Sequence, residues 1–122
     1  MSIPLLAALI LTGISATSQA AGNIEAGERL FKWCVSCHAV GPSASAGFGP
    51  QLNGLFGRKA GSTPDYRYSA AMKGAGIVWS ESTLTAFLHN PSGVVPGTKM
   101  QFWGIGNDQK IADLLAYLRT FK

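Results

Sequence analysis

Apolar side chains recur at helical spacing in the first part of the chain that carries charge. At about 100° per residue, one face between residues 23 and 34 gathers a set of five: Ile24, Gly27, Leu30, Phe31 and Cys34. Charged residues occupy the opposite face, and Asn23 stands where an N-cap is expected. The pattern predicts an amphipathic helix over about residues 23–34, whose apolar face ends at a cysteine.

A second helix is predicted over residues 81–89. Leu84, Phe87 and Leu88 form its buried stripe, and Ser80 is placed to cap it. Glu81 lies in the first turn, where the helix dipole favours a negative charge.

A third helix is predicted over residues 108–121, and a short helical turn over residues 70–73. The apolar stripe of the third helix consists of Ile111, Leu114, Leu115, Leu118 and Phe121. Asn107 or Asp108 is its expected N-cap.

Two long segments, residues 41–63 and 91–106, are rich in Gly, Pro and Ser and are predicted to be loops. They also contain large apolar side chains: Phe48, Leu52, Leu55, Phe56, Phe102 and Trp103. Three short helices provide too little surface for these side chains to pack against. We therefore predict an all-α domain in which a large, flat, apolar cofactor completes the core.

Composition narrows this picture. The 122 residues allow one domain, and a hydrophobic content of 47% is enough for a globular rather than a disordered chain. A small domain with so many loops gains from a disulfide, a metal or a cofactor, and the chain has 2 cysteines. Lys and Arg outnumber Asp and Glu by 10 to 6. There is no basic run of the kind that binds nucleic acid, so the excess charge favours acidic protein partners.

The N-terminus predicts export. Residues Ile3 to Ile14 are almost all apolar, and Ser18-Gln19-Ala20 puts small residues at the positions that a signal peptidase reads. The apolar stretch is shorter than the roughly 20 residues of a membrane span. We expect residues 1–20 to be a signal peptide, with an uncleaved anchor as the alternative, and residues 21–122 to be the mature domain. No Lys or Arg precedes the apolar stretch, which is atypical of such signals.

The strongest chemical signal is Cys34-Val35-Ser36-Cys37-His38. The pattern C-x-x-C-H is typical of c-type haem attachment. Two thiols at this spacing can each add to one vinyl group of a single haem, and the histidine beside the second thiol then offers an axial nitrogen to the iron. Export agrees with this reading, because the attachment takes place outside the cytoplasm.

Three other interpretations of the cysteines are weaker. A redox dithiol of the thioredoxin type needs a βαβ context, which this helical, Gly-rich sequence lacks. A structural zinc site needs four ligands, and the chain has only Cys34, Cys37, His38 and His89 to offer. A disulfide between Cys34 and Cys37 would close too small a loop to stabilise the domain much.

The second axial position has three candidates from the residues alone. His89 lies about 140° from the apolar stripe of its helix and is expected to face solvent. Met72 also fits a gap-filling core methionine. Met100 ends the tight loop 96–100, which can present a side chain rigidly. Periodicity does not decide among them.

With these motifs in place, the chain resembles the class I cytochromes c, of the mitochondrial type and its soluble bacterial relatives. The resemblance runs from about Gly22 to Leu118. Its landmarks are the C-x-x-C-H motif, GPQLNGLFGR at 49–58, GIVW at 76–79, PGTKM at 96–100 and DLLAYL at 113–118. It implies the cytochrome c fold, with three main helices and long loops around one covalently bound haem.

The resemblance also implies roles for individual residues. Cys34 and Cys37 would form the thioethers, and His38 and Met100 would be the axial ligands of the iron. Pro50 would accept a hydrogen bond from the other ring nitrogen of His38. Five further side chains would contact the cofactor, four near its propionates and one beside the methionine: Arg58, Tyr68, Trp79, Thr98 and Phe102. Gly27 would let the first helix approach the last one closely.

The function implied by this resemblance is that of a one-electron carrier rather than an enzyme. Its partners would be redox proteins with acidic or apolar docking surfaces, such as a respiratory or photosynthetic complex or a dehydrogenase, and not nucleic acid. It would be a monomer in the bacterial periplasm, or in an equivalent intermembrane or lumenal space. The alternatives are a peroxidase-like haem enzyme, if the methionine ligand is lost, and a thiol-disulfide oxidoreductase.

The lysines that usually surround the exposed haem edge are sparse in this chain. Lys32, Lys99 and Lys110 are the candidates for such a ring. Other residues occupy positions where mitochondrial-type proteins tend to carry lysine, namely Trp33, Ser92, Gly93, Gly106 and Asn107. We therefore expect docking to depend less on salt than in that type, with apolar contact contributing more.

Overall fold

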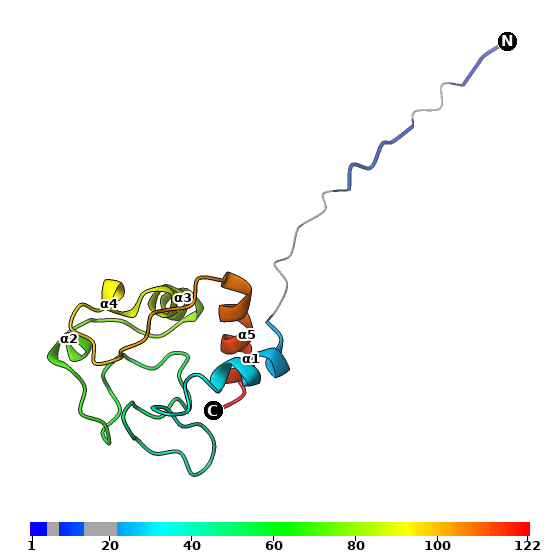
Figure 1. The fold of residues 1–122 in the computed structure, drawn as a ribbon. Coiled ribbons are helices and arrows are strands. Elements are labelled where there is room, and N and C mark those ends of the chain that lie inside the picture. Colours follow the sequence, from blue (N-terminus) through cyan, green and yellow to red (C-terminus); the bar gives the residue numbers. More distant parts are fainter. Residues whose placement is uncertain (5–7, 14–21) are drawn as a thin grey trace.

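Five helices build the domain in the computed structural model, which describes residues 1–4, 8–13 and 22–122 (Figure 1). They are α1 (Ile24–Phe31), α2 (Ala70–Lys73), α3 (Glu81–His89), α4 (Pro91–Val94) and α5 (Asp108–Leu118). Within the described ranges, the extended structure amounts to one isolated antiparallel bridge between Lys59 and Val78. The predicted all-α class is confirmed.

The N-terminal prediction is not tested by this structure. Its cleavage site, Ser18-Gln19-Ala20, lies outside the described residues, as do residues 5–7. Of the helices in the described ranges, none has the length and hydropathy that crossing a membrane requires.

Helix α1 begins as predicted and ends earlier. The Asn23 side chain accepts a hydrogen bond from the backbone N–H of Ala26 at 2.8 Å. The helix was expected to reach Cys34 but ends at Phe31. Directly beyond that point the backbone bonds span three residues rather than four, as in the bonds from the N–H of Trp33 to the Leu30 carbonyl, 3.0 Å, and from the N–H of Cys34 to the Phe31 carbonyl, 2.8 Å. The cysteine motif therefore lies in a run of tight turns and not in the helix.

Helix α3 matches its predicted bounds because its cap is local. The Ser80 hydroxyl accepts from the Thr83 N–H at 3.2 Å, and the Thr83 hydroxyl accepts from the Ser80 N–H at 2.8 Å. Such a reciprocal capping box fixes the start of a helix with contacts made only three residues apart.

Helix α5 starts after Asn107, whose side chain accepts from the Lys110 N–H at 3.0 Å. It ends at Leu118, three residues before the predicted end at Phe121. The Thr120 hydroxyl donates to the Tyr117 carbonyl at 2.7 Å, so a side chain satisfies one of the last carbonyls of the helix. This local bond accounts for the early end.

Two short helices complete the set. Helix α2 was predicted, whereas α4 falls inside a segment predicted to be loop. Asn90 caps α4 by accepting from the Gly93 N–H at 3.1 Å, and Pro91 occupies the first helical position, which suits its fixed φ. The Asn-Pro pair was therefore a start signal that periodicity did not reveal.

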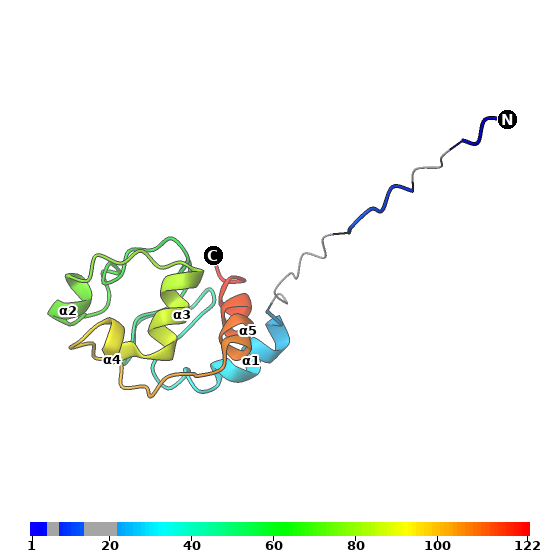
Figure 2. The same ribbon diagram turned by 90° about the horizontal axis from the view of Figure 1, so that it is seen from above.

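Helices α1 and α5 pack against each other, as Figures 1 and 2 both show. The contact centres on Gly27, where an added Cβ would lie only 2.0 Å from the Asp113 carbonyl oxygen. The Phe31 and Tyr117 rings close the same contact, with centroids 5.5 Å apart. The missing side chain at Gly27 sets the closeness of the two helices, as the resemblance implied.

The variant Gly27→Ala is expected to lower the free energy of unfolding by about 1–3 kcal/mol, because a methyl group cannot share space with the Asp113 backbone. Denaturant unfolding would measure the loss. Gly106→Ala is the matched control, since no atom lies within 4 Å of its added Cβ, and its effect should stay within about 0.5 kcal/mol. Equal stability of the two variants would contradict the role of Gly27.

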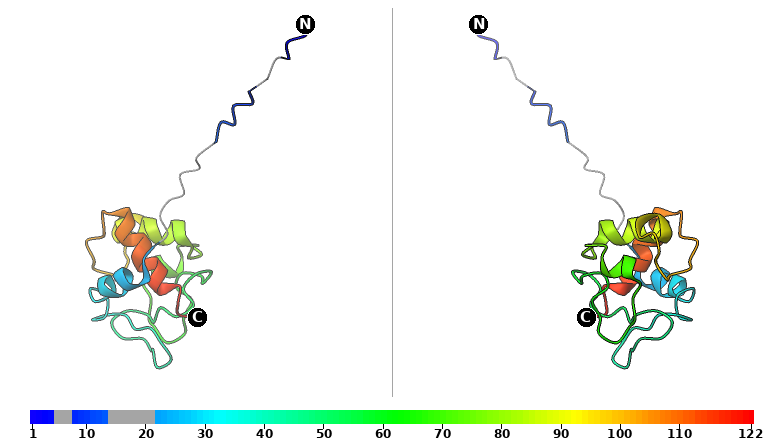
Figure 3. Two further views of the ribbon diagram at one scale, coloured as in Figure 1. Left: turned by 90° about the vertical axis from the view of Figure 1, so that its right-hand side faces the viewer. Right: turned by 90° about the vertical axis from the view of Figure 1, so that its left-hand side faces the viewer.

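The loops supply part of the core, which is why they are ordered. The teal and green loops of residues 39–65 lie at the opposite end of the molecule from α3 and α4 in Figures 1 and 3. From the loops, Leu55, Ala60 and Ile105 contribute side chains that are at most 5% exposed. Phe48 and Trp103 are 87% and 97% exposed, so they pack little against the chain itself. Their packing against a cofactor stays a prediction.

Candidate functional site

A cavity of about 480 Å³ lies between the loops and the helices. This volume falls in the range of roughly 300–1,000 Å³ typical of small-molecule and cofactor sites. All ten site residues predicted above line it: Cys34, Cys37, His38, Pro50, Arg58, Tyr68, Trp79, Thr98, Met100 and Phe102. Segments more than 60 residues apart in sequence thus meet at one place.

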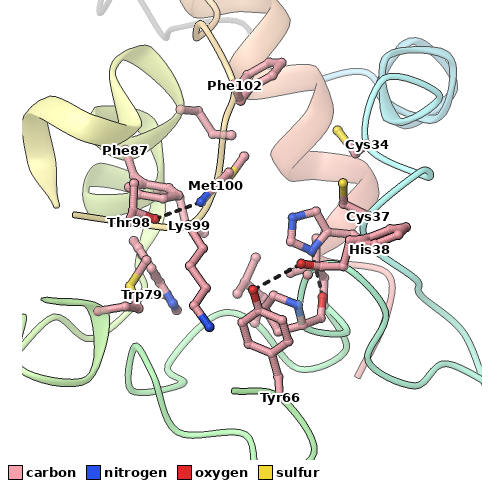
Figure 4. Close-up of a pocket in the computed structure, with 18 of the residues that line it drawn as sticks. Cys34, Cys37, His38, Tyr66, Trp79, Phe87, Thr98, Lys99, Met100 and Phe102 are labelled. Carbon is pink, nitrogen blue, oxygen red and sulfur yellow. Dashed lines mark hydrogen bonds between the residues drawn. The ribbon is translucent and has the colours of Figure 1, made fainter. Parts of the chain in front are cut away.

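One wall of the cavity carries the cysteine motif (Figure 4). The N–H groups of Cys37 and His38 both donate to the Cys34 carbonyl, at 3.1 and 2.9 Å. A single turn therefore presents two thiols and an imidazole together. Cys34 is half-buried, Cys37 is exposed, and neither is in a disulfide.

The environment of the thiols does not favour thiol exchange. Burial, and secondarily the neighbouring Cys37, raises the pKa of the Cys34 thiol to about 11. Reactive cysteines of dithiol oxidoreductases have lowered pKa values, because the thiolate is the attacking species. Cys34 is therefore protonated at neutral pH and poorly suited to that chemistry.

His38 is oriented by a backbone carbonyl. Its Nδ1 lies 2.7 Å from the Pro50 oxygen, which can only accept, so Nδ1 carries the proton and Nε2 keeps its lone pair. Burial is the main cause that lowers the pKa of His38 below 6.5, with Arg58 adding to it and the Pro50 bond opposing it. The imidazole is therefore neutral at pH 7, which is the form that binds metals.

Gly49 is a site residue that the sequence analysis missed. A Cβ at this position would lie 2.7 Å from Cε1 of His38. Only glycine lets the backbone before Pro50 pack so closely against the ring. Its place at the start of the GPQLNGLFGR segment was the available signal.

Arg58 brings a positive charge to the cavity. Its guanidinium donates to the carbonyls of Gln51 at 2.9 Å and Asn53 at 3.1 Å. Burial lowers the pKa of Arg58 below its usual value, while Tyr68 and Asp65 raise it, and the group stays charged at neutral pH. Among the described residues, no carboxylate lies within ion-pair distance of it. The site therefore suits an anionic group.

Met100 lies across the cavity from His38 (Figure 4). Its N–H donates to the Thr98 hydroxyl at 3.3 Å, which fixes the end of the loop. The Trp79 and Phe87 rings line the same cavity, and their centroids lie 5.2 Å apart. Met72, from α2, is buried and lines the same cavity. Both methionines therefore remain candidates on geometry.

His89 is removed from the set of candidates by its position. It does not line the cavity, and its ring nitrogens lie 2.7 Å from the Ile105 carbonyl and 2.7 Å from the Asp108 carboxylate. The expectation that His89 faces solvent was wrong in part, because these contacts leave its side chain only 36% exposed. Over the described ranges, no three His, Cys, Asp or Glu side chains are grouped to hold a metal.

Tyr66 and Lys99 also line the cavity. The sequence analysis did not predict that either of them lines it. The Tyr66 hydroxyl donates to the Phe48 carbonyl at 3.1 Å, and Lys99 Nζ donates to the Arg67 carbonyl at 2.6 Å. Each bond joins segments at least 18 residues apart, so no short-range signal could have revealed it.

Comparison with known proteins agrees with this geometry. The profile of the cytochrome c family matches residues 24–122. A cytochrome c2 of Rhodomicrobium vannielii is 52% identical over 106 residues, which are 87% of this chain and 85% of that protein. A cytochrome c of Sesamum indicum is 50% identical over 99 residues, 80% of this chain and 89% of that one.

A solved structure is similar as well. Cytochrome cH from Methylobacterium extorquens superposes with a TM-score of 0.76 at 41% identity, over 81% of this chain and 99% of that chain. Matches of this extent confirm the predicted resemblance and the predicted fold. The chain belongs to the cytochrome c family, and it is an electron-transfer protein with covalently bound haem c rather than an enzyme.

Proposed function

We propose that Cys34 and Cys37 hold the haem through thioether bonds and that His38 and Met100 are the axial ligands of its iron. One observation carries this proposal: thiols and a neutral imidazole form one wall of a single cavity, and a methionine thioether stands on the facing wall. When bound, the haem supplies an iron that takes up and releases one electron. Because His38 and Met100 would both hold the iron, no site would remain on it for a substrate.

The imidazole is held ready for this role. The bond to the Pro50 carbonyl fixes the ring orientation and the tautomer, so that Nε2 is the nitrogen with a lone pair. Because Gly49 has no side chain, it leaves room for the imidazole ring of His38. On the opposite side of the cavity, the Thr98 hydroxyl accepts a hydrogen bond from the Met100 N–H and so fixes the backbone of that residue.

Arg58, Tyr68 and Trp79 are proposed to meet the haem propionates. Arg58 brings a charge without a carboxylate partner among the described residues, and its carbonyl accepts from the Trp79 N–H at 2.9 Å. The Tyr68 hydroxyl forms a hydrogen bond with the hydroxyl of Thr63, which is buried. Phe102, which lines the same cavity, is proposed to cover the methionine side. His/Met ligation in such a pocket favours a higher reduction potential than more basic ligand pairs do.

We also propose that residues 1–20 are removed on export and that residues 21–122 act as a monomer in the periplasm. The C-x-x-C-H motif supports this location, since haem attachment takes place outside the cytoplasm. The partners would be redox proteins, such as a respiratory or photosynthetic complex or a dehydrogenase, with acidic or apolar docking surfaces.

The purified, exported protein tests these proposals in one sample. We expect a pyridine haemochrome assay to give one haem c per chain and thiol titration to find no reactive thiol. The mass measured under denaturing conditions should equal that of residues 21–122 plus one haem. Colourless material with both thiols reactive would refute the attachment. A mass that includes residues 1–20 would refute only the processing.

A further inference from the structure

Three large aromatic side chains are exposed, two of them lining the cavity and the third next in sequence to residues that line it. Trp33 is 59% exposed and Phe48 is 87% exposed, yet both line the cavity, so they lie at its rim. Trp103 is 97% exposed and follows directly on Gln101 and Phe102, which line the same cavity. We refer to Trp33, Phe48 and Trp103 as the aromatic rim.

The rim has no structural role that its contacts reveal. Within residues 22–122, every ring-to-ring contact involves other aromatic side chains, from Phe31 to Phe121. Trp79, by comparison, is 7% exposed and packs on Phe87. Neighbouring apolar groups left in water mark interaction sites rather than core. Replacing the rim side chains should therefore leave the fold intact.

Charge contributes little at this mouth. The Lys99 ammonium donates to the Arg67 carbonyl at 2.6 Å and lies 5.9 Å from the Tyr66 ring centroid, so this side chain is held against its own chain although it keeps its positive charge. Lys32 is the residue directly before Trp33 in the chain. The three rim residues are themselves uncharged, so an acidic partner surface would find few cations to pair with there. The complementary surface is uncharged and apolar.

We propose that the aromatic rim is the docking surface for a redox protein that presents an uncharged, apolar patch beside its own redox centre. This inference rests on the proposed function, because a carrier must bring the mouth of its cofactor cavity against its partner. Tryptophan is among the residues that most often dominate binding energy at protein interfaces. A standard interface buries about 800 Å² on each partner, enough to span three segments around one cavity mouth. Of the two partner chemistries named above, the rim selects the apolar one.

Electrodes coated with alkanethiol monolayers test this with surfaces of known chemistry. We expect the haem-loaded protein to exchange electrons rapidly with a monolayer of mixed methyl and hydroxyl end groups, and slowly with a carboxylate monolayer. On the uncharged surface the rate should change less than about twofold as added salt shortens the Debye length from about 30 Å to about 3 Å.

Variants assign the effect to the rim. The double variant Phe48→Gln/Trp103→Gln should exchange electrons at least about tenfold more slowly on the uncharged monolayer, equivalent to ~1.4 kcal/mol. Its haem content should match that of the unmodified protein, and the single variant Trp103→Gln, at a residue outside the cavity lining, should also keep the visible spectrum and the reduction potential. Lys32→Gln tests charge, and Ile24→Gln tests loss of an apolar side chain that is 50% exposed but away from the cavity. Both should stay within about twofold of the unmodified rate.

Three results would overturn the inference. The first is faster exchange on the carboxylate monolayer, with a steep fall as salt is added. The second is sedimentation of the protein as a dimer that the double variant abolishes, which would assign the rim to a second copy of the chain. The third is a protein without haem and without any redox signal, which would refute the proposed function too and is told apart by its colourless spectrum.

Discussion

The double variant Cys34→Ser/Cys37→Ser is expected to release its haem on a denaturing gel and to lose about 5 kcal/mol or more of its free energy of unfolding. Serine hydroxyls cannot form thioethers, so the haem would be held by its axial ligands alone and could dissociate. Denaturant unfolding followed by circular dichroism would measure the stability, and haem staining of the gel would measure attachment.

The size of this effect follows from the cavity. At ~24 cal/mol per Å³, an empty cavity of about 480 Å³ corresponds to about 12 kcal/mol of lost stability. Partial collapse and water entering the open side reduce this figure. Even half of it approaches the total of roughly 5–15 kcal/mol that keeps a small domain folded. The chain without haem should therefore be largely unfolded.

The variant Ser36→Ala is the matched control, because Ser36 is exposed between the two cysteines and leaves both thiols in place. It should retain covalent haem and unfold at the same denaturant concentration as the unmodified protein. A double cysteine variant that unfolds together with this control would show that the cofactor is not part of the core.

Replacing Met100 with alanine is expected to lower the reduction potential by a sizeable part of the ~0.8 V range over which axial ligands tune haem proteins. Loss of the thioether opens one side of the iron to water and to external ligands. The weak absorption band near the red edge of the spectrum, assigned to the bond between methionine and ferric iron, should vanish. A redox titration and a spectrum of the oxidised protein measure the two effects.

Met72→Leu separates the two methionines. Met72 is buried at the same cavity, and leucine has a similar volume but no sulfur. If Met100 is the ligand, this variant keeps the band and shifts the potential far less. Loss of the band in Met72→Leu, with Met100→Ala unaffected, would reverse the assignment.

The starts of the helices were the most predictable part of the fold. Asn23, Ser80 and Asn107 each accept a bond from an N–H group three residues later, so the signal and its effect lie in the same short segment. The ends were predicted less well. The first helix stops before Cys34 and the last before Phe121, because apolar periodicity continues into turns that are no longer α-helical.

The site divides in the same way. Cys34, Cys37 and His38 could be identified from sequence because attachment of haem demands one fixed local spacing. The second ligand could not, since Met72, Met100 and His89 each have suitable chemistry. Only packing brings Met100 and Met72 to the cavity and ties His89 to Asp108.

By itself, then, the sequence predicted α1, α2, α3 and α5, the haem attachment motif and, through its resemblance, the family. The tertiary structure decided which loop side chains are buried and which remain in water: Leu55 is 4% exposed and Trp103 is 97% exposed, although both lie in Gly-rich loops. The physical reason is the sequence separation over which each interaction acts. Caps and covalent spacing act within about four residues, whereas burial depends on segments that are distant in sequence and meet only in the folded chain.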